Sequence, residues 1–184
     1  MEVSDITNLL IPQSEWAQPD LYLYENDDRL KLNIAGAIQY SGISSIGGVV
    51  LGFRLIQHAI KLTAGSAPTQ RDAISIYTAF PGRGTQDAFE YTCRAIRDNR
   101  YCCDTSLHHP AAQLGQRGQF LFTVRANEQT MVLTPADGLP QRSYFDADRH
   151  SKDGNEAALR WRDEKINFAN TLLSLPPEQC LKVL

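Results

Sequence analysis

Apolar residues recur along residues 48–63 with the spacing of one helical face. The positions i, i+4, i+7 and i+11 of this stretch are all apolar, as Val49, Phe53, Ile56 and Ile60. This spacing predicts an amphipathic α-helix, and Gly65 is placed to end it. The segment is the strongest helical signal in the chain, so the rest of the fold is expected to pack around it.

Three further helices are expected from the same kind of pattern. Residues 28–41 begin at Asp27 or Asp28 and stop at Gly42. Residues 86–99 carry an apolar stripe made of Phe89, Cys93 and Ile96. The last predicted helix covers residues 155–174 and ends before two prolines. Its apolar positions are Leu159, Ile166, Phe168 or Ala169, and Leu173.

Strands are predicted where β-branched and aromatic residues cluster or alternate with polar ones. The segments that fit are residues 72–80, 99–105, 119–125 and 130–135, with a turn at 126–129 between the last two. The acidic segment 146–155 is expected to be a loop. This order of elements indicates an α+β fold with a mixed or antiparallel sheet and helices on one side.

A length of 184 residues suits one domain with one core. We expect an N-terminal arm at 1–27, a core at 28–135 and a C-terminal helix at 152–175. The net charge of −3, with no basic block, argues against nucleic acid as a partner. The acidic N-terminus does not resemble a signal peptide.

Two further observations bear on the compartment. No apolar run approaches the roughly 20 residues that span a bilayer, so no membrane association is expected. The cysteines, Cys93, Cys102, Cys103 and Cys180, contain no C-x-x-C pair and two of them are adjacent. Adjacent cysteines make a poor disulfide framework, which favours reduced thiols in a cytoplasmic protein.

Two glycine-bearing turns precede predicted helices. The first, QYSGISSIGG at 39–48, holds small residues but no strong metal ligand, acid or base. The second, PGRGT at 81–85, lies between a strand and a helix. Glycines at a helix start let backbone N–H groups face an anion, although an ordinary turn needs them as well. Arg83 adds a cation that is able to hold a carboxylate or phosphate.

The order and spacing of these blocks resemble the FmdE-like (FwdE-like) family of formylmethanofuran dehydrogenase proteins. Its members read F-H-G-H-x-C-P-G before a helix that contains G-F/Y-R. Here residues 40–47 read YSGISSIG, and Gly52-Phe53-Arg54 follows. The family's second block ends in D-A, which Asp87-Ala88 matches, and a third block is similar to GQRGQFLFTV.

What the resemblance implies about the fold is specific. It spans roughly residues 30–135, the size of a compact domain. It implies a helix–strand–helix–three-strand core with a mixed sheet covered by helices, followed by a C-terminal helix. It also implies a homodimer. Four apolar or aromatic residues of the arm and the last helix would otherwise need cover within one chain: Tyr22, Tyr24, Leu172 and Leu173.

The metal chemistry of the family does not carry over. Its His, His and Cys ligands in the first block and its Cys in the second are replaced here by Ser41, Ile43, Ser45 and Gly84. Hydroxyl and aliphatic groups are not ligands for soft metals. We therefore expect no metal and no cofactor, and a vacated pocket that keeps the backbone shape. Its expected substrate-binding residues are Tyr40, Ser41, Ser45, Arg83 and Arg54.

The candidate catalytic residues are Asp87, His108 and His109. Asp87 is either a base beside the pocket or a carboxylate that stabilises the first helical turn. His108 and His109 end the ligand-rich segment CCDTSLHH and are either acid–base groups or a solvated loop pair. Adjacent residues of a strand point to opposite faces, which disfavours joint metal ligation by Cys102 and Cys103.

These residues predict a metal-independent enzyme of a biosynthetic pathway, of the lyase, isomerase or cyclase type. Arg83 would hold a small anionic substrate while Asp87 and one of the histidines transfer protons in a rearrangement, elimination or cyclisation. Two alternatives stay open. One is a protein that binds a small molecule or cofactor without turnover, and the other is an accessory protein with a vestigial pocket.

Overall fold

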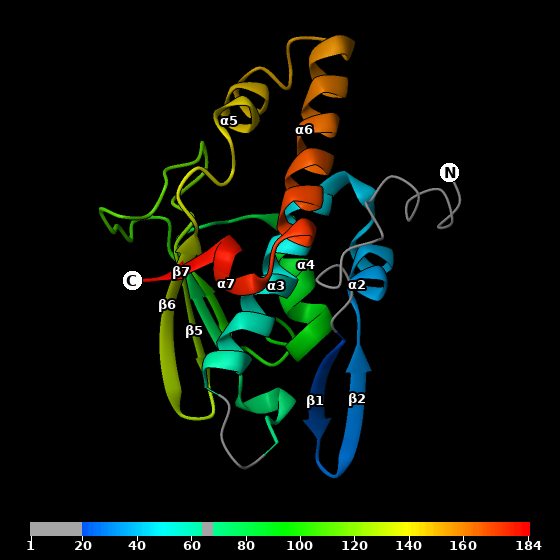
Figure 1. Ribbon diagram of the computed structural model, residues 1–184, viewed down its shortest axis with the longest axis vertical. Helices are drawn as coiled ribbons and strands as arrows, with labels where there is room; N and C mark the ends of the chain where they lie inside the picture. Colours follow the sequence, from blue (N-terminus) through cyan, green and yellow to red (C-terminus); the bar gives the residue numbers. More distant parts are fainter. Residues whose placement is uncertain (1–19, 64–67) are drawn as a thin grey trace.

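The computed structural model describes residues 20–63 and 68–184 of the chain. These residues form a mixed α+β fold with six α-helices and a mixed five-stranded sheet (Figure 1). The predicted α+β class is therefore confirmed. The predicted close of the first long helix at Gly65 and most of the predicted N-terminal arm lie outside the described residues.

The central sheet has the strand order β4-β3-β5-β6-β7. Its strands are β3 Ser75–Thr78, β4 Tyr101–Cys103, β5 Phe122–Ala126, β6 Gln129–Pro135 and β7 Leu181–Val183. Strands β3 and β4 are parallel and the other neighbours are antiparallel. Ala126 pairs with Gln129, and the two residues between them have φ values of 50° and 64°. The predicted β5–β6 hairpin is thus a tight two-residue turn.

The segment expected to be a single helix at 28–41 is a strand followed by a shorter helix. Strand β1, Leu21–Glu25, pairs antiparallel with β2, Asp28–Leu32, in a separate hairpin. From Arg29 to Leu32 the sequence RLKL alternates polar and apolar residues, a period of two that the helical interpretation overlooked. Helix α2, Ile34–Ser41, begins only after Asn33, whose side-chain oxygen accepts a hydrogen bond from Gly36 N at 2.8 Å.

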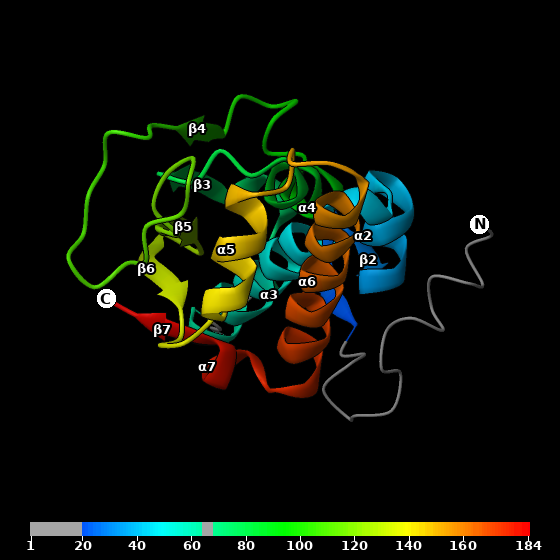
Figure 2. The same ribbon diagram turned by 90° about the horizontal axis from the view of Figure 1, so that it is seen from above.

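Helix α3, Ile46–Leu62, lies at the centre of the molecule, with the sheet on one side and α6, Asn155–Ser174, on the other (Figure 2). Both helices were predicted, and both are confirmed. The side chains of α3 are buried on almost every face, including Val49, Phe53 and Ile56. The core is therefore wider than the single apolar stripe that the sequence pattern indicated.

Burial also explains the apolar length of this segment. Residues Ile43–Leu62 form one helical stretch that is long and apolar enough to cross a membrane, which the sequence pattern had not led us to expect. Length and composition alone support this, and 67% of its apolar window is buried inside the fold. A core helix of a soluble protein passes the same test, so the stretch is weak support for a membrane span.

Helix α4, Arg83–Cys93, starts and ends earlier than predicted. Arg94 takes a left-handed conformation with φ of 52°, which terminates the helix. Phe89 and Cys93 are buried as expected, but Ile96 lies beyond the helix and is 39% exposed. Within α6, Ile166, Phe168, Ala169 and Leu173 are buried as expected, whereas Leu159 is 50% exposed because it lies in the half of the helix farther from the sheet (Figure 1).

The segment expected to be an acidic loop contains the end of another helix. Helix α5, Arg142–Arg149, packs beside α6 (Figure 1). Its Tyr144 ring lies 4.7 Å from the Trp161 ring and 5.2 Å from the Phe168 ring, measured between centroids. These aromatic contacts hold the α5–α6 pair together. After α6, a short helix α7, Pro177–Cys180, leads into β7, and neither element was predicted from the sequence.

Glycines in α3 and at the starts of α3 and α4 serve the packing of helices. A Cβ atom at Gly52 of α3 would lie 2.8 Å from Ala88 Cβ of α4, and one at Gly84 would lie 2.4 Å from Ser45 O. On the opposite side, a Cβ atom at Gly47 would lie 3.1 Å from Lys165 O of α6. Small residues at these crossings let the three helix backbones approach closely, which gives Gly47 of the first turn a packing role.

We expect Gly52→Ala to destabilise the fold by about 1–3 kcal/mol, the usual cost of overpacking. This loss should exceed the gain in helix propensity of roughly 1 kcal/mol. Urea unfolding measures the change in the free energy of unfolding. The double variant Gly52→Ala/Ala88→Gly should recover part of the combined loss because it removes the colliding methyl group. If the loss of stability in the double variant equals the sum of the losses in the two single variants, this contact does not limit the approach of α3 and α4.

Candidate functional site

A pocket of about 110 Å³ lies at the amino end of α4, just beyond the carboxyl end of β3. Four parts of the chain form its walls: the turn before α3, the start of α4, the loop before β5, and the α5–α6 pair. The lining residues are Ser44, Ser45, Gly48, Phe80, Gly82, Arg83, Gly84, Gly115, Gln116, Arg117, Phe120, Tyr144, Phe145, Asp148, Trp161 and Lys165. We call this cavity the α4 pocket.

The turn at 40–47 and the start of α4 lie against each other beside this pocket. The closeness of Gly84 to Ser45 O fixes one point of contact. A second is a hydrogen bond of 2.5 Å from Ser41 Oγ to Asp87 Oδ2. The two glycine-bearing turns are therefore brought together by the fold.

The structure distributes the expected substrate-binding residues unevenly. Ser45 and Arg83 line the α4 pocket. Arg83 is exposed, and its side chain makes no hydrogen bond or ion pair with any residue that the structure describes. Ser41 pairs with Asp87 instead of lining the pocket. Tyr40 is 56% exposed, and its ring lies 6.2 Å from that of Tyr91.

The two candidate histidines are not among the residues that line the α4 pocket. His108 is exposed in the loop after β4, and His109 is half-buried there. The His109 N–H donates to Gln119 Oε1 at 2.7 Å, and its Nδ1 accepts from Ala111 N at 3.2 Å. These contacts order the loop locally, so the expected grouping of Asp87 with a histidine around one substrate is not found.

Arg54, expected to bind substrate, is instead completely buried. Its Nε donates to Leu172 O at 3.2 Å and its Nη2 to Leu173 O at 3.5 Å. These carbonyls belong to the last turn of α6, where a cation also complements the helix dipole. Burial lowers the pKa of this guanidinium. We assign Arg54 a structural role at the carboxyl end of α6.

Arginines perform the same task at the carboxyl end of α4. Arg71 donates to Tyr91 O at 2.6 Å and to Thr92 O at 2.8 Å. Arg100 Nη2 donates to Cys93 O at 2.7 Å. The carbonyls that the helix leaves unpaired are thus satisfied by guanidinium groups.

The α4 pocket itself contains three cations and one carboxylate. Arg117 Nη2 lies 3.9 Å from Asp148 Oδ1, and Lys165 Nζ donates a hydrogen bond to Ser44 O. Burial raises the pKa of Asp148, while Arg117 and Lys165 oppose that rise. Burial lowers the pKa of Lys165, and Asp148 opposes the fall. Both shifts bring the pKa values of these two groups closer to neutral pH, a pattern that is common at functional sites.

Aromatic rings form much of the remaining wall. The Phe80 and Phe120 rings are stacked with centroids 4.1 Å apart, and Phe145 meets Phe120 edge-on at 6.0 Å. The Trp161 ring lies 5.2 Å from Lys165 Nζ. Such walls limit the access of water and strengthen the electrostatic interactions of the charged groups.

Sequence reasoning missed Arg117, Asp148 and Lys165 as site residues. Asp148 belongs to a segment expected to be a loop, and Lys165 lies on a helix expected only to pack. One signal was present, because Arg117 falls within the block GQRGQFLFTV that the resemblance had singled out. Nothing in the sequence places that block beneath the α5–α6 pair.

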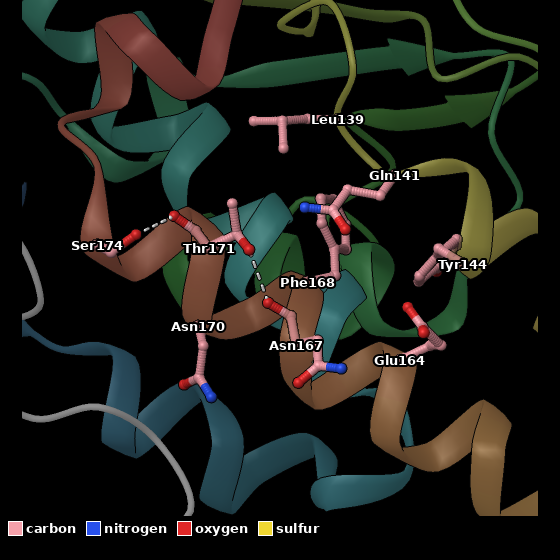
Figure 3. Close-up of a pocket in the computed structure, with 9 residues that line it drawn as sticks. All are labelled: Leu139, Gln141, Tyr144, Glu164, Asn167, Phe168, Asn170, Thr171 and Ser174. Carbon is pink, nitrogen blue, oxygen red and sulfur yellow. Dashed lines mark hydrogen bonds between the residues drawn. The ribbon is translucent and has the colours of Figure 1, made fainter.

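A larger groove of about 350 Å³ follows α6 (Figure 3). We call it the α6 groove; its lining residues are Leu139, Gln141, Tyr144, Glu164, Asn167, Phe168, Asn170, Thr171 and Ser174. Thr171 donates to Asn167 O and Ser174 to Thr171 O, each at 2.9 Å, so both hydroxyls bond to their own helix. Glu164 accepts from Ser143 at 3.0 Å. The α6 groove therefore offers fewer charged groups than the α4 pocket.

The residues at the family's metal positions do not fit a metal ion. Ser41 and Ser45 offer only hydroxyls, and Ile43 and Gly84 offer no side-chain donor. Within residues 20–63 and 68–184 there is no group of three or more His, Cys, Asp and Glu arranged to hold a metal. We derive no chemical step through a metal.

Comparisons with protein-family models, curated proteins and solved structures find no match to this chain. The function must therefore be inferred from the geometry and chemistry of the α4 pocket.

We expect Arg54→Met to lower the free energy of unfolding by about 1–3 kcal/mol, because it removes donors from buried carbonyls. Anion binding per folded molecule should stay unchanged. Thermal unfolding and calorimetric titration measure the two properties. Arg125→Met, which changes an exposed arginine of β5, is the control. A loss of binding without a loss of stability would restore Arg54 as a ligand contact.

Proposed function

We propose that this protein is a metal-independent enzyme that transfers protons on a small anionic substrate bound in the α4 pocket. The observation that carries the proposal is the convergence of Arg83, Arg117, Lys165 and Asp148 in one pocket with aromatic walls. These groups come from separate parts of the chain, which is typical of a functional site and is not required by any single packing contact.

Three of these four groups have a direct chemical role in this proposal. Arg83, which has no partner within the described residues, holds the anionic group of the substrate. The Asp148 carboxylate accepts a proton from the substrate, and the Lys165 ammonium returns one at another atom. Exchange with solvent then restores both groups. The reaction is a rearrangement, elimination or cyclisation of the substrate and needs no oxidant or reductant.

These roles differ from those expected from the sequence. Asp148 and Lys165 replace Asp87 and the two histidines as acid–base groups because they line the pocket and their pKa values are shifted. Asp87 positions the turn through its hydrogen bond with Ser41. Ser45 stays a lining residue, and Tyr40 lies outside the lining.

We also propose that the fold is FwdE-like and that the chain is a divergent relative of the FmdE-like family of formylmethanofuran dehydrogenase proteins. In support, position 84 lies against Ser45. Both are positions at which the resemblance implies metal ligands. The Ser41–Asp87 hydrogen bond joins the same two blocks. On this proposal the binding site has moved from the family's metal positions towards the α5–α6 pair.

A second candidate function is the binding of a small molecule without turnover. Lys165 is already hydrogen-bonded to Ser44 O, and Asp148 lies near Arg117. Charged groups that are already engaged with neighbouring residues are also found in sites that bind a ligand without converting it. Distinguishing the two functions requires a measurement of turnover.

To test for turnover, a small amount of protein is incubated with a fraction of anionic metabolites and the products are followed by mass spectrometry. We expect more substrate to be converted than protein is present. Asp148→Asn should slow conversion about 100-fold or more, the scale of general acid–base catalysis. Arg83→Ala should mainly raise the substrate concentration needed for half-maximal rate.

Arg125→Ala is the matched control, since it removes an exposed arginine outside the pocket. If the protein removes only one molecule of a metabolite per chain, and denaturing the protein releases that metabolite unchanged, the protein binds without turnover. Conversion by Asp148→Asn at the rate of the unaltered protein would refute the assigned chemistry.

We propose that the protein is a homodimer, although the support from exposed residues is now weaker. Leu172 and Leu173 are buried within the single chain, with exposures of 0% and 3%. Tyr22 is still 40% exposed. Light scattering at micromolar concentration should give twice the chain mass of 20.6 kDa, and a value equal to that mass would refute the dimer.

A further inference from the structure

The charges that line the α4 pocket do not balance. Three cations, Arg83, Arg117 and Lys165, face the single carboxylate of Asp148, which leaves an excess of two positive charges. Transfer of a proton from Lys165 to Asp148 neutralises both groups and leaves the same excess of two. The surplus is therefore independent of which of these groups holds the proton.

The size of the cavity limits what can neutralise this surplus. Its volume of about 110 Å³ is smaller than that of a cavity of roughly 150 Å³ that holds benzene. A compact charged group fits inside, and any larger organic part must extend towards the opening. Phe80, which is half-buried and stacked on the buried Phe120 at 4.1 Å, offers an apolar surface for that part.

The amino end of α4 adds to the attraction for an anion. This helix has eleven residues, and Gly82 at its N-cap position provides no side-chain hydrogen bond. Gly82, Arg83 and Gly84 all line the pocket. Backbone N–H groups and the helix dipole there favour negative charge beside the guanidinium of Arg83.

We propose that the α4 pocket binds the phosphoryl group of its ligand, as a compact dianion at the amino end of α4 between Arg83 and Lys165. The inference rests on the proposed function in one respect, that this pocket is the substrate site. A dianion matches the excess of two charges, whereas a monocarboxylate leaves one cation uncompensated. Three acceptor oxygens also match a set of donors that come from different directions.

The position of Asp148 sharpens the expectation. Its carboxylate lies 3.9 Å from Arg117 and repels a second anion in the pocket. Removing that charge should therefore strengthen phosphate binding, even though the same change slows the proposed proton transfer. Binding and turnover should respond to Asp148→Asn in opposite directions.

The test is calorimetric titration of the full chain with inorganic phosphate, phenyl phosphate and benzoate in low-salt buffer at about pH 8, where the phosphates are dianionic. We expect phosphate to bind more tightly than benzoate, and phenyl phosphate more tightly still. Arg83→Ala should weaken phosphate binding about tenfold to a hundredfold, the scale of a hydrogen bond to a charged group. Asp148→Asn should bind phosphate at least as tightly as the unaltered protein, and Arg125→Ala should be unchanged.

Three results would overturn the inference. If benzoate binds more tightly than phosphate and depends on Arg83, the ligand is a carboxylate, and the proposed enzyme function survives. Phosphate binding that Arg83→Ala does not weaken would place the phosphate outside this pocket. If none of the three anions binds, both this inference and the proposed anionic substrate fail.

Discussion

The close approach of α3 to α4 is the constraint on which the rest of the structure depends. Gly52 meets Ala88, and Gly84 meets Ser45 O, at separations that leave no room for a further carbon atom. With these backbones fixed, the start of α4 has only one place, beside the turn that leads into α3. The α4 pocket lies at that junction, so its position follows from helix packing. Gly48, at the end of the first glycine-bearing turn, meets the same requirement, because its Cβ atom would lie 3.2 Å from Gly84 Cα.

The arginines at the two ends of the helices have different roles. At carboxyl ends, Arg54 serves α6 while Arg71 and Arg100 serve α4, each by donating to carbonyls that the helix leaves unpaired. At the amino end of α4, Arg83 has no carbonyl to bind and points to solvent and the pocket. This division separates arginines that hold the fold from those that are available to a ligand.

The sequence predicted best those elements whose residues repeat with a single helical or strand spacing over a short stretch. Helices α3 and α6 and the β5–β6 hairpin were predicted because their apolar spacing or turn residues act over a few positions. Strand β2 was missed because an alternation of only four residues, RLKL, was read as part of a longer helical pattern. Ser45 and Arg83 were placed at the pocket through the spacing of two turns. Asp148 and Lys165 were not, because they reach it through the packing of α5 and α6, which depends on contacts distant in sequence.

The contact at Gly84 also bears on which side chains position 84 can hold. A cysteine at position 84, as in the resembling family, would place its Cβ atom 2.4 Å from Ser45 O. The backbone of the turn therefore occupies the space that such a side chain needs. A cysteine introduced at position 84 would therefore meet backbone atoms of the turn, whereas positions 41, 43 and 45 already carry side chains. On the proposed kinship, regaining a cysteine at position 84 would also require the turn to move, which this substitution alone does not provide.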